Sequence, residues 1–304
     1  MKNLFNRFQD VIRSTNGKIN GHPYASKHFI KSWAYYLLLY IKVRAFSSVL
    51  KYHWISGLKI IVDVNDWTFA RNIFLRLNEF DHSCFAVHFM KKDETFVDVG
   101  ANLGHYSLLV SAISGAKVFA YEPMPDTYQK LIRNIKINRL ERLICAYNVG
   151  IGSSYGKLSM KIMRNNGHSY ISNSISNTVK VEIIPLDSVL IDRCPTMIKI
   201  DVEGFEYKVL QGAKNILKNK SLKAILIEIN HHCQRYGDNI ENTFNYITNL
   251  GFKAYNYEPI NRKLNKIDLY NSKTENIIFL RNEESAGNRL KEGKDIVFDR
   301  SYLV

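Results

Sequence analysis

The chain has 304 residues, of which 46% are hydrophobic and 12% aromatic, and its formal net charge is +14. This composition excludes a disordered chain and predicts a globular protein with one large domain and a smaller attached segment. The four cysteines lie far apart and form no C-x-x-C pair, which excludes a zinc or disulfide framework. They indicate reduced thiols and, since no secretory signal is evident, a cytoplasmic protein.

The positive charge is concentrated at the start of the chain. Residues 1–60 hold ten Lys or Arg and a single acid, Asp10, so they contribute +9 of the +14. Such a segment attracts an anionic membrane or a nucleic acid, or it forms an ordinary solvated surface. The apolar run WAYYLLLYI at 33–41 is too short to cross a bilayer, which takes about 20 residues. It predicts a helix that lies in a membrane interface or packs on the main domain.

The elements that follow alternate between strand and helix. Residues 1–55 have a helical pattern, 58–64 alternate like a strand, and 65–80 form a turn and a helix. Alternation from residue 93 onward predicts an α/β fold with a mostly parallel sheet, helices on both faces and an antiparallel pair at one edge. The expected strands are 95–100, 117–123, 143–152, 179–186, 197–204, 223–230, 253–259 and 275–281, and the expected helices are 105–114, 125–138, 207–219 and 241–251.

The segment FVDVGANLG ends a strand in a glycine turn, where open α/β sheets bind their ligands. Its spacing is G-x-x-x-G, because Asn102 and His105 stand where a dinucleotide fingerprint has glycines. The turn therefore disfavours a pyrophosphate and with it a nicotinamide oxidoreductase. Glu122 ends the next strand, where a carboxylate can accept two hydrogen bonds from a ribose diol. A nucleoside without phosphates, such as S-adenosylmethionine, satisfies both features.

Three segments, FVDVGANLG, AYEPMPDTYQKLIRNIKIN and IKIDVEGFEYKVLQGA, resemble the FkbM-type S-adenosylmethionine-dependent methyltransferases. The resemblance implies a class I, Rossmann-like fold with a seven-stranded sheet. It divides the chain into a basic, mostly helical segment (1–64), a methyltransferase domain (65–282) and a tail (283–304). It also implies that Glu122 binds the ribose and that the region of Asn148 meets the adenine. The residues that would line the methionine side of the cofactor are Asp98, Gly100, Asn102 and Gly104.

Polar side chains end two further strands that we expect to be neighbours. Asp201 and Glu203 follow one strand, and period-2 alternation would point both to the same side of the sheet. Asp201 or Glu203 is a candidate general base or would hold the cofactor ammonium, and His231 after the next strand is another candidate base. In a second interpretation Asp201, Glu228 and Asn230 coordinate Mg²⁺, although our primary prediction contains no metal.

The expected reaction is methyl transfer to a hydroxyl, and the resemblance favours a sugar of a glycan, glycolipid or related metabolite. The section 153–177, with His168, would shape the acceptor pocket. A D/N-P-P-Y/F motif is absent, which disfavours base methylation and nucleic acid as a partner. The alternatives are an RNA methyltransferase and a non-catalytic scaffold that binds the cofactor. The basic N-terminal segment would allow peripheral contact with an anionic membrane.

Overall fold

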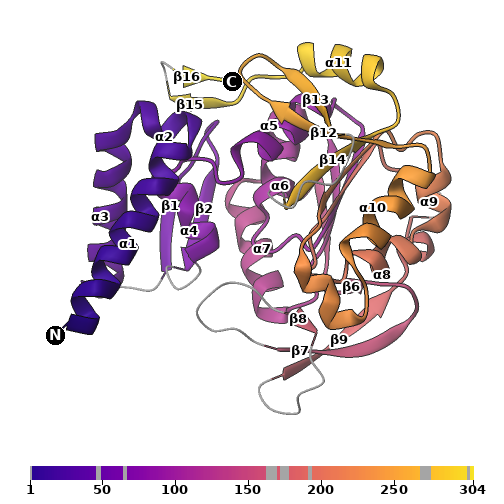
Figure 1. Cartoon of the computed structure of the whole chain (residues 1–304), viewed down its shortest axis with the longest axis horizontal. Coiled ribbons are helices and arrows are strands. Elements are labelled where there is room, and N and C mark those ends of the chain that lie inside the picture. The colour runs from indigo at the N-terminus through magenta and orange to yellow at the C-terminus, as the bar shows by residue number, and fades with distance from the viewer. Residues whose placement is uncertain are drawn as a thin grey trace. The chain divides into compact units, whose positions relative to one another are not determined.

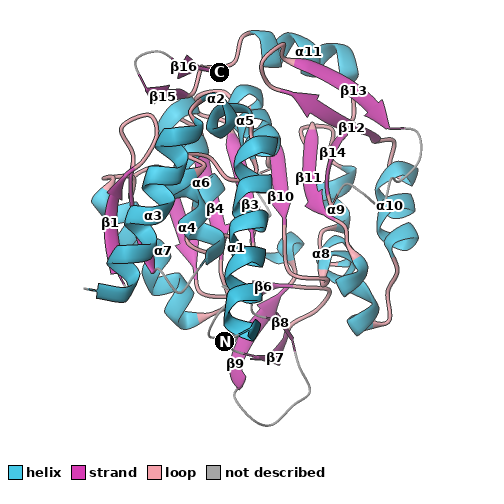
Figure 2. Cartoon of the chain, turned by 60° about the vertical axis from the view of Figure 1, so that its left-hand side comes forward, coloured by secondary structure: helices cyan, strands magenta, loops and turns pink. Residues whose placement is uncertain are grey.

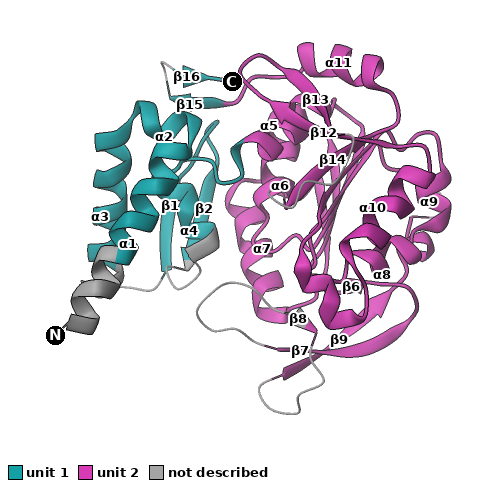
Figure 3. Ribbon diagram, in the orientation of Figure 1, with its two compact units in different colours: residues 1–80, 165–167, 297–303 teal, residues 81–164, 168–296, 304 magenta. Residues whose placement is uncertain are grey.

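The computed structural model describes residues 2–45, 49–63, 67–161, 170–171, 178–190, 194–267, 275–299 and 302–304. They form two compact units, coloured teal and magenta in Figure 3. Unit 1 holds the described residues up to Phe80 together with those of 297–303, and unit 2 holds the described residues from Asp81 to Ile296 together with Val304. The predicted limits of the methyltransferase domain, 65 and 282, stay a prediction.

Unit 1 is mostly helical but also contains two short β-hairpins. Residues 49–53, which we expected to be helical, form a strand that pairs antiparallel with the predicted strand at 59–63. Their side chains alternate between exposed and half-buried, as a strand with one covered face requires. The elements are α1 (Lys2–Gly21), α2 (Pro23–Lys27), α3 (Phe29–Ala45), β1 (Val49–His53), β2 (Lys59–Asp63), α4 (Trp67–Phe74), β15 (Val297–Asp299) and β16 (Tyr302–Leu303).

Unit 2 is built on an eight-stranded sheet with the order β13-β12-β14-β11-β10-β3-β4-β5. The strands from β11 to β5 are parallel, and β14 is antiparallel to both of its neighbours. The predicted mostly parallel sheet with an antiparallel β12–β14 pair is confirmed, and β13 adds one strand at the edge. The bounds are β3 (Thr95–Val99), β4 (Lys117–Tyr121), β5 (Ile144–Tyr147), β10 (Met197–Ile200), β11 (Ala224–Glu228), β12 (Lys253–Glu258), β13 (Lys263–Ile267) and β14 (Asn276–Leu280).

Helices cover both faces of this sheet, with α5 to α7 on one side and α8 to α10 on the other (Figure 1). The predicted helix at 105–114 is present, but its second half is π-helical, a variant often found at functional sites. The helices are α5 (Phe80–Phe89), α6 (His105–Leu109), η1 (Val110–Ser114), α7 (Pro125–Ile137), η2 (Leu186–Ser188), α8 (Glu206–Gln211), α9 (Lys214–Lys218), η3 (His231–Tyr236), α10 (Ile240–Asn249) and α11 (Glu283–Lys291).

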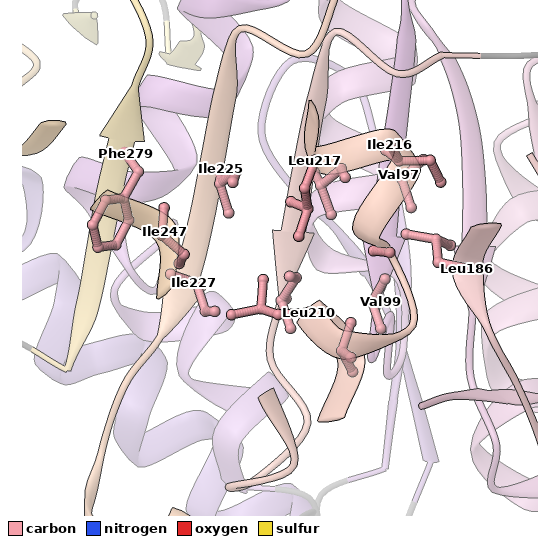
Figure 4. Packing of buried hydrophobic residues seen from close by; sticks show 14 of the residues in the cluster. Val97, Val99, Leu186, Leu210, Ile216, Leu217, Ile225, Ile227, Ile247 and Phe279 are labelled. Carbon is pink, nitrogen blue, oxygen red and sulfur yellow. The ribbon is translucent and has the colours of Figure 1, made fainter. Parts of the chain in front are cut away.

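A hydrophobic core lies between the central sheet and helices α8–α10, and the strand residues that build it leave their neighbours to face the opposite side of the sheet. Alternate strand residues such as Val97, Ile225 and Ile227 are fully buried and pack with Leu210 and Ile247 (Figure 4). Each such side chain contributes about 1.5–3 kcal/mol through burial. Because side chains alternate along a strand, the residues between them point to the α5–α7 side. That side receives the polar residues of the candidate site.

A four-stranded sheet with the order β6-β9-β7-β8 lies in sequence between β5 and β10. Figure 2 shows its strands grouped apart from the central sheet. The section 153–177, which we expected to shape the acceptor pocket, is thus partly strand, since β7 pairs with β9 along its whole length. The bounds are β6 (Gly150–Ile151), β7 (Gly156–Lys161), β8 (Tyr170–Ile171) and β9 (Thr178–Ile184). His168 lies outside the described residues.

Candidate functional site

The carboxyl end of β3 carries a buried acid, Asp98, whose side chain anchors the next helix. Its Oδ2 accepts hydrogen bonds from the backbone N–H of Ser107 at 3.1 Å and from the Ser107 hydroxyl at 2.6 Å. Its Oδ1 is buried and has no hydrogen-bond partner among the described residues. Burial raises the pKa of Asp98, while the Lys199 ammonium opposes the shift. The site thus keeps one free acceptor beside the glycine turn.

The two glycines of the turn are required by close packing within the protein. Gly100 has a φ of +81°, and a Cβ there would lie 1.9 Å from the carbonyl oxygen of Asp201. Gly104 has a φ of +94°, and a Cβ would lie 2.7 Å from Cδ1 of Leu131. Both conformations favour glycine on backbone grounds alone. The chain turns at the two glycines as predicted. The space beside each glycine is filled by other atoms of the protein, so close packing is one reason why glycine is needed there.

Glu122 ties the end of β4 to the glycine turn. Its Oε1 accepts from the N–H of Met124 at 2.9 Å, and its Oε2 accepts from the N–H of Asn102 at 3.0 Å. Burial raises the pKa of Glu122 to about 7. The Asn148 amide donates to the carbonyls of Glu122 and Pro123, both at 2.9 Å. The structure therefore brings Asn102, Glu122 and Asn148 together, and Asn148 braces the backbone of the β4 loop.

The end of β10 contains a buried cation that the sequence analysis missed. The Lys199 ammonium lies 2.9 Å from Oδ2 of Asp201 and 4.8 Å from the ring centre of Tyr106. The Lys199 side chain is 5% exposed, whereas that of Asp201 is 27% exposed. Asp201 thus presents a carboxylate that is oriented by a buried partner but reachable from solvent. The detectable signal was a lysine inside a strand whose other residues are apolar.

Glu228 at the end of β11 lies in an environment that disfavours its charge. Burial, reinforced by the carboxylates of Asp201 and Glu203, raises the pKa of Glu228 to about 10. Its Oε2 is buried without a hydrogen-bond partner among the described residues. The raised pKa favours the protonated form of Glu228, a carboxylic acid that can donate a hydrogen bond.

Glu203 and His231 are the other predicted catalytic residues. β10 ends at Ile200 and Glu203 has a φ of +56°, so the period-2 alternation expected for Asp201 and Glu203 does not extend this far. A Glu203 carboxylate oxygen lies 3.3 Å from Nδ1 of His232. His231 begins η3 with an exposed side chain.

The loop that carries Glu203 is held in place by Glu206, which the sequence analysis did not identify. One carboxylate oxygen of Glu206 accepts from the N–H groups of Val202 and Gly204, both at 3.0 Å. Gly204 has a φ of +103°, and a Cβ there would lie 2.5 Å from the carbonyl carbon of His232. The loop conformation is thus determined by backbone contacts, which the order of residue types does not reveal.

Two further histidines lie close enough to Lys199 for its charge to affect them. His105 Nε2 is 2.7 Å from the Ser83 hydroxyl. Burial, assisted by Lys199, lowers the pKa of His105 to about 3 and that of His82 to about 4. Both imidazoles are therefore neutral at physiological pH. They add uncharged hydrogen-bonding groups on the Lys199 side of the sheet.

The polar atoms at this sheet edge fit the cofactor implied by the sequence. The buried oxygens Asp98 Oδ1 and Asn102 Oδ1 lack partners among the described residues, and both are acceptors. S-adenosylmethionine offers complementary donors in its ammonium and ribose hydroxyls. In the described part of the chain no group of three or more His, Cys, Asp or Glu side chains is placed to hold a metal ion. The Mg²⁺ alternative at Asp201, Glu228 and Asn230 stays a prediction.

Comparisons with known proteins identify relatives of this domain. A family model described as the methyltransferase FkbM domain matches residues 98–254. The hexuronic acid methyltransferase AglP of Haloferax volcanii is 32% identical over 145 residues, which cover 46% of this chain and 57% of AglP. The methyltransferase sdnD of Sordaria araneosa is 27% identical over 175 residues, which cover 46% of this chain and 68% of sdnD. The match thus spans little more than half the length of AglP.

Among solved structures, an S-adenosylmethionine-dependent O-methyltransferase from Thermotoga maritima aligns with 66% of this chain and 64% of its own, at 16% identity and a TM-score of 0.38. The family assignment depends instead on the sequence model, which spans more than half of the chain and contains the glycine turn, Glu122 and the Asp201 loop. The sheet, with its parallel strands and antiparallel β14, has the predicted class I architecture. The chain belongs to the FkbM family of S-adenosylmethionine-dependent methyltransferases.

Proposed function

We propose that this protein transfers a methyl group from S-adenosylmethionine to a hydroxyl oxygen of a sugar. The observation that carries the proposal is the packing of Asp201 against the glycine turn, where the Asp201 carbonyl occupies the space that a Gly100 side chain would need. The cofactor turn and the best-oriented carboxylate are therefore direct neighbours. AglP, named as a hexuronic acid methyltransferase, supports a sugar as the acceptor.

The cofactor side would be held by groups that already have fixed positions. Asp98 Oδ1 would accept from the methionine ammonium, and Glu122 would accept from the ribose with lone pairs not used by Met124 and Asn102. Gly100 and Gly104 maintain the turn, and Asn148 braces the loop beside the adenine. Bound S-adenosylmethionine would supply a methyl group on a sulfonium, whose S–CH₃ bond would break readily because the product that leaves is a neutral thioether.

The acceptor side needs a base, and Asp201 is the best placed candidate. As the hydroxyl oxygen forms its bond to the methyl carbon, its proton would pass to the Asp201 carboxylate, which Lys199 orients from 2.9 Å. A positioned base contributes about 10²–10⁴-fold to the rate. Protonated Glu228 and the neutral His82 and His105 would offer hydrogen bonds to a polyhydroxylated acceptor. Glu203 and His231 are secondary candidates.

The test is methyl incorporation from labelled S-adenosylmethionine into glycolipid, polysaccharide, small-molecule and RNA fractions of host cells. We expect label in a saccharide as an alkali-stable methyl ether. Asp201→Asn should lower the turnover number by about 10²–10⁴-fold while cofactor affinity changes little. Glu182→Gln, at an exposed acid of β9, is the matched control and should stay active. A non-catalytic scaffold would give no label in any fraction.

An RNA acceptor is the alternative, favoured by the +9 charge of residues 1–60. It predicts label in the RNA fraction and binding that weakens steeply with salt. Label confined to RNA would replace the sugar proposal.

A further inference from the structure

Helix α3 carries a row of large apolar side chains on its solvent-exposed face. Ile30 is 84% exposed, Leu37 is 51% exposed and Ile41 is 56% exposed. Their spacing of seven and four residues places them on one face of an α-helix, and Leu38, at 53% exposure, widens that face. We call Ile30, Leu37, Leu38 and Ile41 the α3 apolar face.

The packing of unit 1 does not require this face. Helix α3 buries the opposite side, where Ser32, Tyr36 and Leu39 have little exposed surface. Tyr36 packs edge-on against Phe74 of α4, with ring centres 5.4 Å apart. A helix with one covered face normally carries polar residues on the other, and one that is apolar on both usually has a second apolar environment.

Charged and aromatic residues flank the α3 apolar face. Lys31 and Lys42 on the same helix are exposed, and Lys31 stays 49% exposed although it lies 3.6 Å from Asp299. Phe29 is 39% exposed and lies 6.5 Å from Trp33 between ring centres. Apolar insertion with lysines and aromatic rings at the rim is the pattern of helices that lie in a membrane interface.

Charge decides between a membrane and a second copy of the chain as the occupant. Residues 1–60 contain ten basic residues and one acidic residue. Two copies that met through α3 would bring two such segments together, and their like charges would repel. Anionic lipid headgroups attract the segment instead, and each Lys or Arg near the surface adds to that attraction.

We propose that α3 docks this protein on an anionic membrane, with the α3 apolar face inserted at the level of the headgroups. The contact is peripheral, because among the described helices none is long and apolar enough to cross a bilayer. Membrane docking of this kind does not depend on the identity of the methyl acceptor. Membrane docking would bring the enzyme to the same surface as a lipid-carried acceptor.

The experiment is flotation of the full chain with vesicles of phosphatidylcholine, alone or mixed with phosphatidylglycerol. We expect binding only to the anionic vesicles, and weaker binding as salt is added. The variants Leu37→Glu and Ile41→Glu should each lower the partition coefficient by about tenfold or more, since each removes an inserted side chain and adds a negative charge. Ile260→Glu is the matched control, because Ile260 is 55% exposed in unit 2.

The other outcomes are decisive as well. The α3 variants should unfold at the same temperature as the wild type, because the altered side chains are exposed. Absence of wild-type binding to anionic vesicles would overturn the proposal. So would a wild-type dimer, detected by light scattering, that Leu37→Glu converts to a monomer. Affinity for S-adenosylmethionine, measured without lipid, reports separately on the proposed reaction and should not change in these variants.

Discussion

The two pairs of strand ends that build the site hold their acids in different ways. At the ends of β3 and β4, the carboxylates of Asp98 and Glu122 accept hydrogen bonds from Ser107 and from backbone N–H groups. At the ends of β10 and β11, Asp201 pairs with a lysine, and Glu228 is surrounded by other carboxylates. The first pair of ends is held by the backbone, whereas the second is governed by charge.

This difference suggests a division of labour. Backbone donors cannot reorient without moving a strand, so the β3–β4 ends form a rigid cradle in which a cofactor would always bind in the same position. Charges at the β10–β11 ends respond to each other and to a proton, as general base catalysis requires. Substitutions at the β3–β4 ends should therefore act mainly on the geometry of the turn and on cofactor binding, and substitutions at the β10–β11 ends on the balance of charge.

The largest effect is expected at Gly100, where the two pairs of ends touch. Gly100→Ala places a methyl group 1.9 Å from the Asp201 carbonyl oxygen at a φ of +81°. Left-handed strain and overpacking together should lower the free energy of unfolding by about 2–6 kcal/mol. Urea denaturation measures this loss.

Gly287→Ala in α11 is the control, because no atom lies within 4 Å of the added methyl group, and it should instead raise stability by about 0.5–1 kcal/mol. Equal midpoints for Gly100→Ala and the wild type would refute the close contact.

The second effect concerns the buried charge pair. Lys199→Met leaves the Asp201 carboxylate without its cation, and because Asp201 is 27% exposed the loss should lie near the lower end of about 3–5 kcal/mol. Removing Lys199 should also raise the pKa of Asp98 and of Glu228, since its charge lowers both.

A double-mutant cycle isolates the contribution of the pair. The variant Lys199→Met/Asp201→Asn removes both charges and should be more stable than Lys199→Met alone. Strictly additive losses would show that Lys199 and Asp201 do not interact in solution. Urea denaturation at a fixed pH measures all four proteins of the cycle.

The β3–β4 ends could be anticipated from the sequence, whereas the chemistry of the β10–β11 ends could not. A glycine turn and an acid at the ends of two strands follow from periodicity and spacing, because parallel strands end at one edge. The role of Lys199 was not predicted, because the apolar residues around it identify a buried strand but do not indicate what the lysine contacts. The contact between Glu203 and His232 depends on a left-handed residue, and no residue pattern specified that conformation.

The edge of the sheet illustrates the same limit. β13 (Lys263–Ile267) escaped prediction because its sequence, KLNKI, is polar and mostly exposed, so no apolar alternation marks it. Its existence depends on pairing with β12, a contact with a neighbouring strand. Strands buried on both faces were predicted well because their own composition reflects the burial, as in MIKI of β10.

The smallest effect is a proton released when the cofactor binds. The pKa of Glu122 is raised from 4.5 to about 7, so between these pH values the folded state holds a proton that the unfolded chain has lost. The stability contributed by Glu122 therefore falls as pH rises from about 4.5 to about 7, and the loss is complete above that pH.

Cofactor binding should depend on the same proton. Ribose hydroxyls donate hydrogen bonds to the charged carboxylate, so binding of the cofactor near pH 6.5 should release a proton. Below the pKa of Glu122, the affinity for the cofactor should rise by up to about tenfold for each unit by which the pH is raised. Calorimetry in buffers of different ionisation enthalpy measures the released proton. Glu122→Gln should abolish it, whereas Glu206→Gln, whose carboxyl at the β10 end also has a pKa of about 7, should retain it. If the proton release disappeared in Glu206→Gln but not in Glu122→Gln, the ribose would not bind at Glu122, and the proposed cofactor position at the β3–β4 ends would be wrong.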